Sequence, residues 1–189
     1  MAKGGSFERY ISKFLTKWLT GKEKPYAFWR MPASGGLATI SEENKDLSGD
    51  IIGITIEAKE ICSVINIECK TGYPQTSFWQ HFRETNFKTE EFWKQSVHDA
   101  SKANKHPVLI YRKKNKRPAV GITSDMYDEL YAIKYSLFDI PSISIKFPVK
   151  SGIPELVLLD FEKFFDCIRP EELKQLPNYV VKYNIGETR

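Results

Sequence analysis

The chain has 189 residues, 41% of them hydrophobic and 28% charged, which is typical of one soluble globular domain, alone or with a substantial appendage. No apolar run approaches the roughly 20 residues of a membrane-spanning helix, and the first residues lack the apolar stretch of a signal peptide. The three cysteines form no C-x-x-C pair, so a disulfide framework is not expected. These features predict a cytoplasmic protein without membrane contact.

The net charge of +4 is distributed unevenly. Residues 1–30 carry seven basic and two acidic side chains, and residues 101–120 carry seven basic and no acidic ones. Residues 31–69 reverse this, with seven acidic and two basic. Acidic groups between basic flanks suit a metal site framed by phosphate-binding surfaces, although charges on solvated faces give the same pattern.

The first predicted element is a helix with Ser6 as N-cap and Gly21 as its end. Its apolar residues recur at helical spacing and share one arc: Phe7, Tyr10, Ile11, Phe14, Leu15, Trp18 and Leu19. Glu8 falls inside this arc, where a carboxylate is costly unless it is paired or bound to metal. The alternative is that Glu8 only complements the helix dipole.

Strands and one further long helix follow. Residues 26–30 form a predicted strand, and residues 50–57 and 61–70 a predicted antiparallel hairpin that turns at 58–60. A helix from Thr89 to Pro107 precedes a second hairpin, 108–112 with 118–122, across a basic turn. The order α-β-β-β-α-β-β predicts an α/β fold with a mixed sheet flanked by helices. Strands at 142–147 and 155–159, a short helix capped by Asp160 and a helix start at 169–172 complete the chain.

Candidate chemistry is concentrated at the end of the first predicted hairpin. Glu68 and Lys70 share one face of a strand, while Cys69 points to the other face as a packed thiol. A turn centred on Lys59 pairs Asp50 with Glu68. Two adjacent carboxylates need a cation, oxygen ligands suit Mg²⁺ or Mn²⁺, and a lysine beside the ion suits phosphodiester hydrolysis. E-x-K is, however, also a common tripeptide on exposed strands.

These residues resemble the motifs of the PD-(D/E)XK nuclease superfamily, with archaeal-type Holliday junction resolvases, virus-encoded relatives included, as the closest likeness. The matching segments, in order, are GGSFER at 4–9, Arg30, SGG at 34–36, GDI at 49–51 and IECKT at 67–71. The resemblance covers roughly residues 4–122 and implies a restriction-endonuclease-like core (α-β-β-β-α-β) over residues 1–122. Residues 123–189 are an addition to this minimal fold, and we expect them to form an α+β extension packed on the core.

The resemblance also implies roles for single residues. Asp50, Glu68, Glu8 and the backbone carbonyl of Cys69 would hold Mg²⁺ or Mn²⁺, and Lys70 would be the catalytic lysine. Gln95 would match a glutamine found on this helix in other branches of the superfamily. The residues expected to contact DNA are Lys3, Arg9, Lys13, Arg30, Ser34, Lys113, Lys114, Lys116 and Arg117, with Ser34 and Arg30 near the scissile phosphate.

The functional expectation is a metal-dependent endodeoxyribonuclease that cuts branched DNA as a homodimer, in the host cytoplasm if a virus encodes it. The alternatives are a restriction- or repair-type nuclease on linear DNA and a non-catalytic DNA-binding protein of the same fold. The histidines His81, His98 and His106 lack metal-ligand spacing and are interpreted as exposed or capping. The aromatic residues Phe78, Trp79, Phe82, Phe92 and Trp93 are interpreted as core or interface packing rather than as base-stacking groups.

Overall fold

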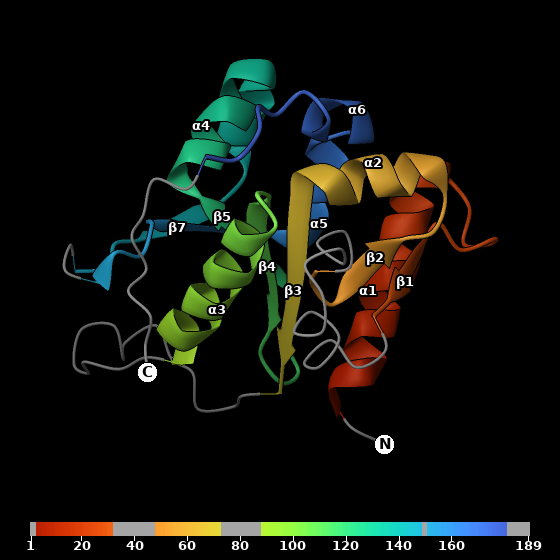
Figure 1. Ribbon diagram of the computed structural model, residues 1–189, viewed down its shortest axis with the longest axis horizontal. Helices are drawn as coiled ribbons and strands as arrows, with labels where there is room; N and C mark the ends of the chain where they lie inside the picture. Colours follow the sequence, from red (N-terminus) through yellow and green to blue (C-terminus); the bar gives the residue numbers. More distant parts are fainter. Residues whose placement is uncertain (1–2, 32–47, 73–87, 149–150, 181–189) are drawn as a thin grey trace.

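A computed structural model describes residues 3–31, 48–72, 88–148 and 151–180 (Figure 1). Its elements, in chain order, are α1 (Lys3–Thr20), β1 (Phe28–Arg30), β2 (Ile51–Gly53), α2 (Ile56–Val64), β3 (Ile65–Thr71), α3 (Lys88–Lys102), β4 (His106–Arg112), β5 (Ala119–Thr123), α4 (Ser124–Ile133), the 3₁₀ helix η3 (Tyr135–Asp139), β6 (Ser142–Ile145), β7 (Leu156–Asp160), α5 (Phe161–Cys167) and α6 (Pro170–Leu173). None of these helices is long and apolar enough to cross a membrane.

The main sheet has five strands in the order β3-β4-β5-β7-β6. β3 and β4 run parallel, and the other neighbours are antiparallel. β1 and β2 form a separate two-stranded antiparallel ribbon. Figure 1 shows this ribbon and α1 on one side of β3, with α3 on the other. The predicted α/β fold with a mixed sheet flanked by helices is confirmed, and it is compatible with a restriction-endonuclease-like fold.

Two apolar cores cover the two faces of the sheet. Adjacent strand residues point to opposite faces, so Ile110 joins the larger core, with α1 and α5, while Leu109 joins the smaller one under α3. Trp93 of α3 is fully buried in the smaller core, and its indole N–H donates to the Pro154 carbonyl at 2.9 Å. The interpretation of Trp93 as a packing residue is therefore confirmed.

α1 is a helix, as predicted, with a narrower buried face. It begins at Lys3, so the predicted N-cap Ser6 lies inside the helix and that prediction is wrong, and it ends at Thr20. Gly21 follows with a φ of 70°, and its N–H donates to the Lys17 carbonyl at 2.8 Å, a helix end that favours glycine. Phe7, Ile11 and Leu15 are buried, but Tyr10 is 40% exposed.

The predicted hairpin of residues 50–57 and 61–70 is wrong, because residues 56–64 form α2. The Thr55 hydroxyl caps this helix by accepting from the Ala58 N–H, and Ala58, Ile61 and Cys62 are buried at helical spacing. The β-branched residues of this segment favoured a strand, but the cap and the helical spacing of its apolar residues prevail. Ile56, the first residue of α2, is 74% exposed.

The C-terminal elements continue the same structure. β7 pairs with β5, so the sheet runs across residue 122. The Asp160 side chain caps α5, as predicted, by accepting from the Lys163 N–H at 3.0 Å. The ring of Phe161 lies 4.5 Å from that of Phe14 on α1. The division into a core and an extension at residue 122 stays a prediction.

Candidate active site

Asp50 lies where the β1–β2 ribbon meets β3. Its backbone N–H donates to the Ile67 carbonyl at 2.8 Å, and its carboxylate oxygen Oδ2 accepts from the Cys69 N–H at 2.8 Å. Asp50 is 7% exposed and Glu68 5% exposed. The two carboxylates are therefore neighbours, as the sequence predicted, but a strand-edge contact brings them together and not the antiparallel register that was expected.

Gly49 makes this approach possible. Its φ is 90°, and a Cβ atom there would lie 2.8 Å from the Ile67 carbonyl oxygen and 2.9 Å from Asn66 Oδ1. Any other residue would clash with β3 and adopt a strained backbone. The glycine thus fixes the residue that follows it against the strand that carries Glu68.

Lys70 is held between β3 and α3. Its Nζ lies 2.6 Å from Glu68 Oε1 and donates to Gln95 Oε1 at 2.9 Å. It also lies 5.8 Å from the centre of the Phe92 ring. The ammonium group is therefore positioned by an anion, a neutral amide and an aromatic face. The contact with Gln95 places that residue at the site.

The carboxylates destabilise one another's charge. The pKa of Glu68 is raised to about 7, first by burial and then by the charge of Asp50, while Lys70 opposes the shift. The pKa of Glu8 is also raised, again first by burial and then by Asp50, with Arg30 opposing. A proton or a cation relieves this repulsion.

Glu8 reaches the site from α1. Its side chain is 16% exposed, and its Oε2 lies 3.6 Å from Nη1 of Arg30 on β1. The helical wheel indicated that Glu8 points toward the interior, and its electrostatic interaction with Asp50 is consistent with that direction. The fourth group, the Cys69 carbonyl, points to the Asp50 side of β3, because the N–H and C=O of one strand residue point the same way. Cys69 itself is buried, and burial raises the pKa of its thiol, as expected of a packing residue.

The oxygen donors of Asp50 and Glu68 fit a hard divalent cation, and the mutual repulsion of the two groups gives the protein a reason to bind one. Within the described residues, no three His, Cys, Asp or Glu side chains are grouped closely enough to form a ready-made metal site. A bound ion would thus use the Asp50–Glu68 pair with the backbone carbonyl, and Glu8 would exchange its contact with Arg30 to join them.

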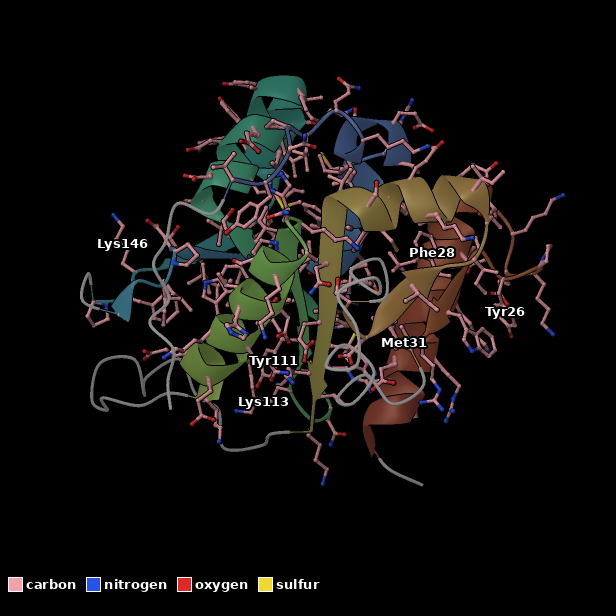
Figure 2. All side chains as sticks on the ribbon, in the orientation of Figure 1. Tyr26, Phe28, Met31, Tyr111, Lys113 and Lys146 are labelled. Carbon is pink, nitrogen blue, oxygen red and sulfur yellow. The ribbon has the colours of Figure 1, made fainter. Side chains whose placement is uncertain are left out.

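The residues expected to contact DNA lie in several places. Arg9 and Lys13 are exposed on α1. Thr71 pairs with Arg112, so the basic turn at 113–117 follows directly beyond the Lys70 end of β3. Figure 2 shows Tyr111 and Lys113 together at this end of the molecule.

Within the turn, Lys114, Lys116 and Arg117 are exposed and Lys113 is half-buried. Arg117 also lies 3.6 Å from Glu162. Ser34 falls outside the described residues, as does the side chain of Lys3.

The sequence interpretation overlooked Arg112, directly before the turn. Its guanidinium carbon lies 4.3 Å from the centre of the Phe7 ring and 5.9 Å from that of Tyr10. The contact ties α1 to the end of β4 beside the candidate site. The pairing of Thr71 with Arg112 across the parallel strands is not readable from residue spacing, so no local pattern marks this arginine.

Some of the histidines and aromatic residues interpreted from the sequence lie in the described part of the chain. His106 is buried, and its Nε2 lies 2.8 Å from the Pro177 carbonyl oxygen, so its interpretation as exposed or capping was wrong. Phe92 and Trp93 are buried in the core, as interpreted. The side chain of His98 is 45% exposed, as interpreted, and lies beside Asp99. His81, Phe78, Trp79 and Phe82 lie outside the described residues.

Glu68 and Lys70 on the edge strand of a mixed sheet, with Asp50 bound against that strand, form the pattern D…E-x-K, and with the family match below they define the class of protein: this is a member of the PD-(D/E)XK nuclease superfamily. A family model described as "Phage putative PDDEXK endonuclease" matches residues 1–175. This match covers most of the chain, so the protein belongs to that family. No curated protein and no solved structure matches the chain.

Proposed function

We propose that this protein is a divalent-metal-dependent endodeoxyribonuclease. The observation that carries the proposal is the convergence of Asp50, Glu68 and Lys70, in which the Asp50 carboxylate accepts from the N–H of the residue between the other two. Adjacent buried carboxylates with a lysine beside them match what hydrolysis of a phosphodiester requires. Membership of an endonuclease family supports the same reaction class.

Asp50, Glu68, Glu8 and the Cys69 carbonyl would hold Mg²⁺ or Mn²⁺. When bound, such an ion supplies Lewis-acid stabilisation of the phosphate charge and lowers the pKa of a coordinated water. The chain's own part is to keep the two carboxylates side by side and largely shielded from solvent. Gly49 and the Asp50–Cys69 hydrogen bond perform that task.

Lys70 is the catalytic residue of the proposal. Its Nζ can orient the attacking water or donate to a phosphate oxygen as negative charge develops there. If Glu68 binds the metal ion, its carboxylate is shared between the ion and Lys70. The position of Lys70 then depends more on its hydrogen bond to Gln95. Gln95 is therefore a positioning residue, which keeps the ammonium group at its place through the 2.9 Å hydrogen bond.

The DNA backbone would run over α1 and the basic turn at 113–117. The turn follows the Lys70 end of β3, and Arg112 directly before it contacts Phe7 and Tyr10 of α1. Cations of both elements would compensate phosphate charges on either side of the scissile bond. Arg30, paired with Glu8, would lie closest to the scissile phosphate.

Branched DNA is the substrate we propose, on the resemblance to Holliday junction resolvases. Resolution of a junction needs two cuts related by near-twofold symmetry, so the active form would be a C₂ homodimer. A monomer at micromolar concentration, both alone and on junction DNA, in analytical ultracentrifugation would argue for a nuclease of linear DNA.

The deciding experiment is cleavage of a four-way junction, a flap, a linear duplex and a single strand with Mg²⁺, Mn²⁺ or EDTA. The wild-type protein should cut one or more of these DNA substrates only when the metal is present.

Lys70→Ala should lose cleavage by orders of magnitude while it still binds Mn²⁺ in calorimetry, because both carboxylates remain. Asp50→Asn should lose both properties, and Glu8→Gln should resemble a milder Asp50→Asn. Lys59→Ala, which changes an exposed lysine of α2, is the matched control. Unchanged cleavage by Lys70→Ala would contradict the mechanism.

A further inference from the structure

The β1–β2 ribbon presents an aromatic pair to solvent close to the candidate site. Trp29 is 39% exposed, although the residues before it on the chain, Ala27 and Phe28, are fully buried. The Trp29 ring centre lies 4.9 Å from that of Tyr26, with the two planes inclined at 59°. Tyr26 projects from the outer side of the molecule in Figure 2. An exposed indole braced by a second ring needs an explanation, since it contributes little to the core.

The register of the ribbon places Trp29 opposite a residue close to Asp50 along the chain. Trp29 pairs with Ile52, and the Met31 N–H donates to the Asp50 carbonyl at 2.8 Å, so the ladder extends to Asp50. Asp50 directly precedes β2, and its backbone bonds to both Met31 and Ile67. Trp29 lies directly opposite Ile52, which is two residues, about 7 Å of extended chain, from Asp50. A nucleotide that adjoins the phosphate at Asp50 would come within reach of the indole.

Charge around the pair favours nucleic acid. Residues 22–30 hold three basic side chains and one acidic one, and the Lys24 ammonium lies 5.9 Å from the centre of the Tyr26 ring. The other exposed aromatic cluster among the described residues, which includes Tyr135 and Phe138, is a useful contrast. Its segment, 124–139, has four acidic side chains and one basic, so it would repel a phosphate backbone.

We propose that Trp29, braced by Tyr26, is a stacking platform for an unpaired base of the DNA substrate, a role that rests on the proposed function and specifies its substrate class. A base within a duplex is already stacked on both sides, so only an unpaired, terminal or extruded base can pack on the indole. The platform would therefore favour DNA that has an unpaired base next to the scissile phosphate. The apolar side chain of Ile52 extends the surface on which that base rests.

The test measures binding in the Lys70→Ala background, so that DNA is retained rather than cut. The probes are a duplex with one unpaired 2-aminopurine and the same duplex with that base paired. Trp29→Ala should weaken binding of the first probe by about 5- to 150-fold, the range of one base–aromatic stack, and that of the second by less than about twofold. Quenching of the unpaired base's fluorescence should be lost with the indole. Trp29→Phe should restore most of both signals, and Trp29→Leu, which keeps apolar contact without an aromatic face, should not.

Tyr135→Ala removes an aromatic side chain that is 75% exposed elsewhere and serves as the matched control, with no change expected on either probe. The proposal would be overturned if Trp29→Ala lost equal affinity for both probes or lost affinity for neither. It would also be overturned if the unpaired base were not quenched by the protein that retains Trp29. A change of sedimentation coefficient in Trp29→Ala would also overturn it, because the face would then contact a second copy of the chain. A protein that selects the unpaired probe but cuts no DNA under any condition would sink the proposed nuclease function alone. Normal cleavage with no effect of Trp29 would sink the platform alone.

Discussion

The ionisation of Glu68 should make the metal-free protein less stable as the pH rises. Its pKa in the folded protein is about 7, against an ordinary value of 4.5, because burial and Asp50 oppose its charge. A carboxyl whose folded pKa is raised stabilises the fold fully below about pH 4.5 and loses that contribution as the pH rises through about 7. At 1.36 kcal/mol per pH unit, the full difference is about 3 kcal/mol, of which about 2 to 3 falls between pH 5 and pH 8.

The perturbation that reveals this is Glu68→Gln, since glutamine keeps the shape of the side chain and cannot ionise. With EDTA present, the stability of the variant relative to the wild type should rise by about 2 to 3 kcal/mol between pH 5 and pH 8. Urea unfolding at several pH values, followed by circular dichroism, measures the free energy of unfolding of both proteins. Glu23→Gln, a change of an exposed glutamate, is the control and should show no such trend.

Metal should reverse the difference. Mg²⁺ at 100 times its dissociation constant would stabilise the wild type by about 2.7 kcal/mol and the variant much less. A stability difference that stays constant from pH 5 to pH 8 would refute the reasoning, because Glu68 would then carry its charge at no cost. The same result would remove the argument that the carboxylate pair needs a cation.

Three further changes test separate parts of the structure. Gln95→Leu should lower the cleavage rate about 10- to 100-fold, the cost of a misplaced catalytic group, and leave Mn²⁺ affinity unchanged. Gln95→Glu keeps an acceptor for Lys70 and should retain more activity. Equal cleavage rates in the two variants would contradict a positioning role. Replacing the four cations of the 113–117 turn with glutamine should flatten the salt dependence of DNA binding by roughly 0.9 in log–log slope for each phosphate that is no longer neutralised; an unchanged slope would remove the turn from the DNA surface. Gly53→Ala should destabilise the fold by about 1 to 3 kcal/mol in urea unfolding, because its Cβ would lie 2.4 Å from the Ala58 carbonyl carbon; wild-type stability would show that β2 and α2 can move apart at little cost.

The elements with strong periodicity were predictable from the sequence. α1 and α3 were identified by apolar residues at helical spacing, and β4 and β5 by two short apolar runs around a charged turn. The segment from Ile56 to Val64 was not, because its β-branched residues match a strand while its cap depends on Thr55 accepting from Ala58. Propensity alone does not distinguish these outcomes.

The residues of the candidate site could be predicted from the sequence, but the contacts that bring them together could not. Asp50, Glu68 and Lys70 could be selected by chemistry and by family likeness. These residues are close together because Asp50 contacts the edge of β3. This contact joins two sheets, and no sequence pattern indicates that the two are adjacent. The exposed Tyr26–Trp29 pair could not be predicted for a similar reason, since the exposure of Trp29 depends on the pairing of β1 with β2.

The contact between the β1–β2 ribbon and the main sheet determines how the candidate site can open. Asp50 belongs to the ribbon and Glu68 to the main sheet, and the hydrogen bonds of Asp50 with Ile67 and Cys69 cross the boundary. An ion shared by both carboxylates would therefore link the ribbon to the edge of the main sheet. Local opening of the ribbon would have to break that link first, so amide hydrogen exchange at Asp50 and Cys69 should slow when metal binds, while exchange within β5 and β7 should stay as it is.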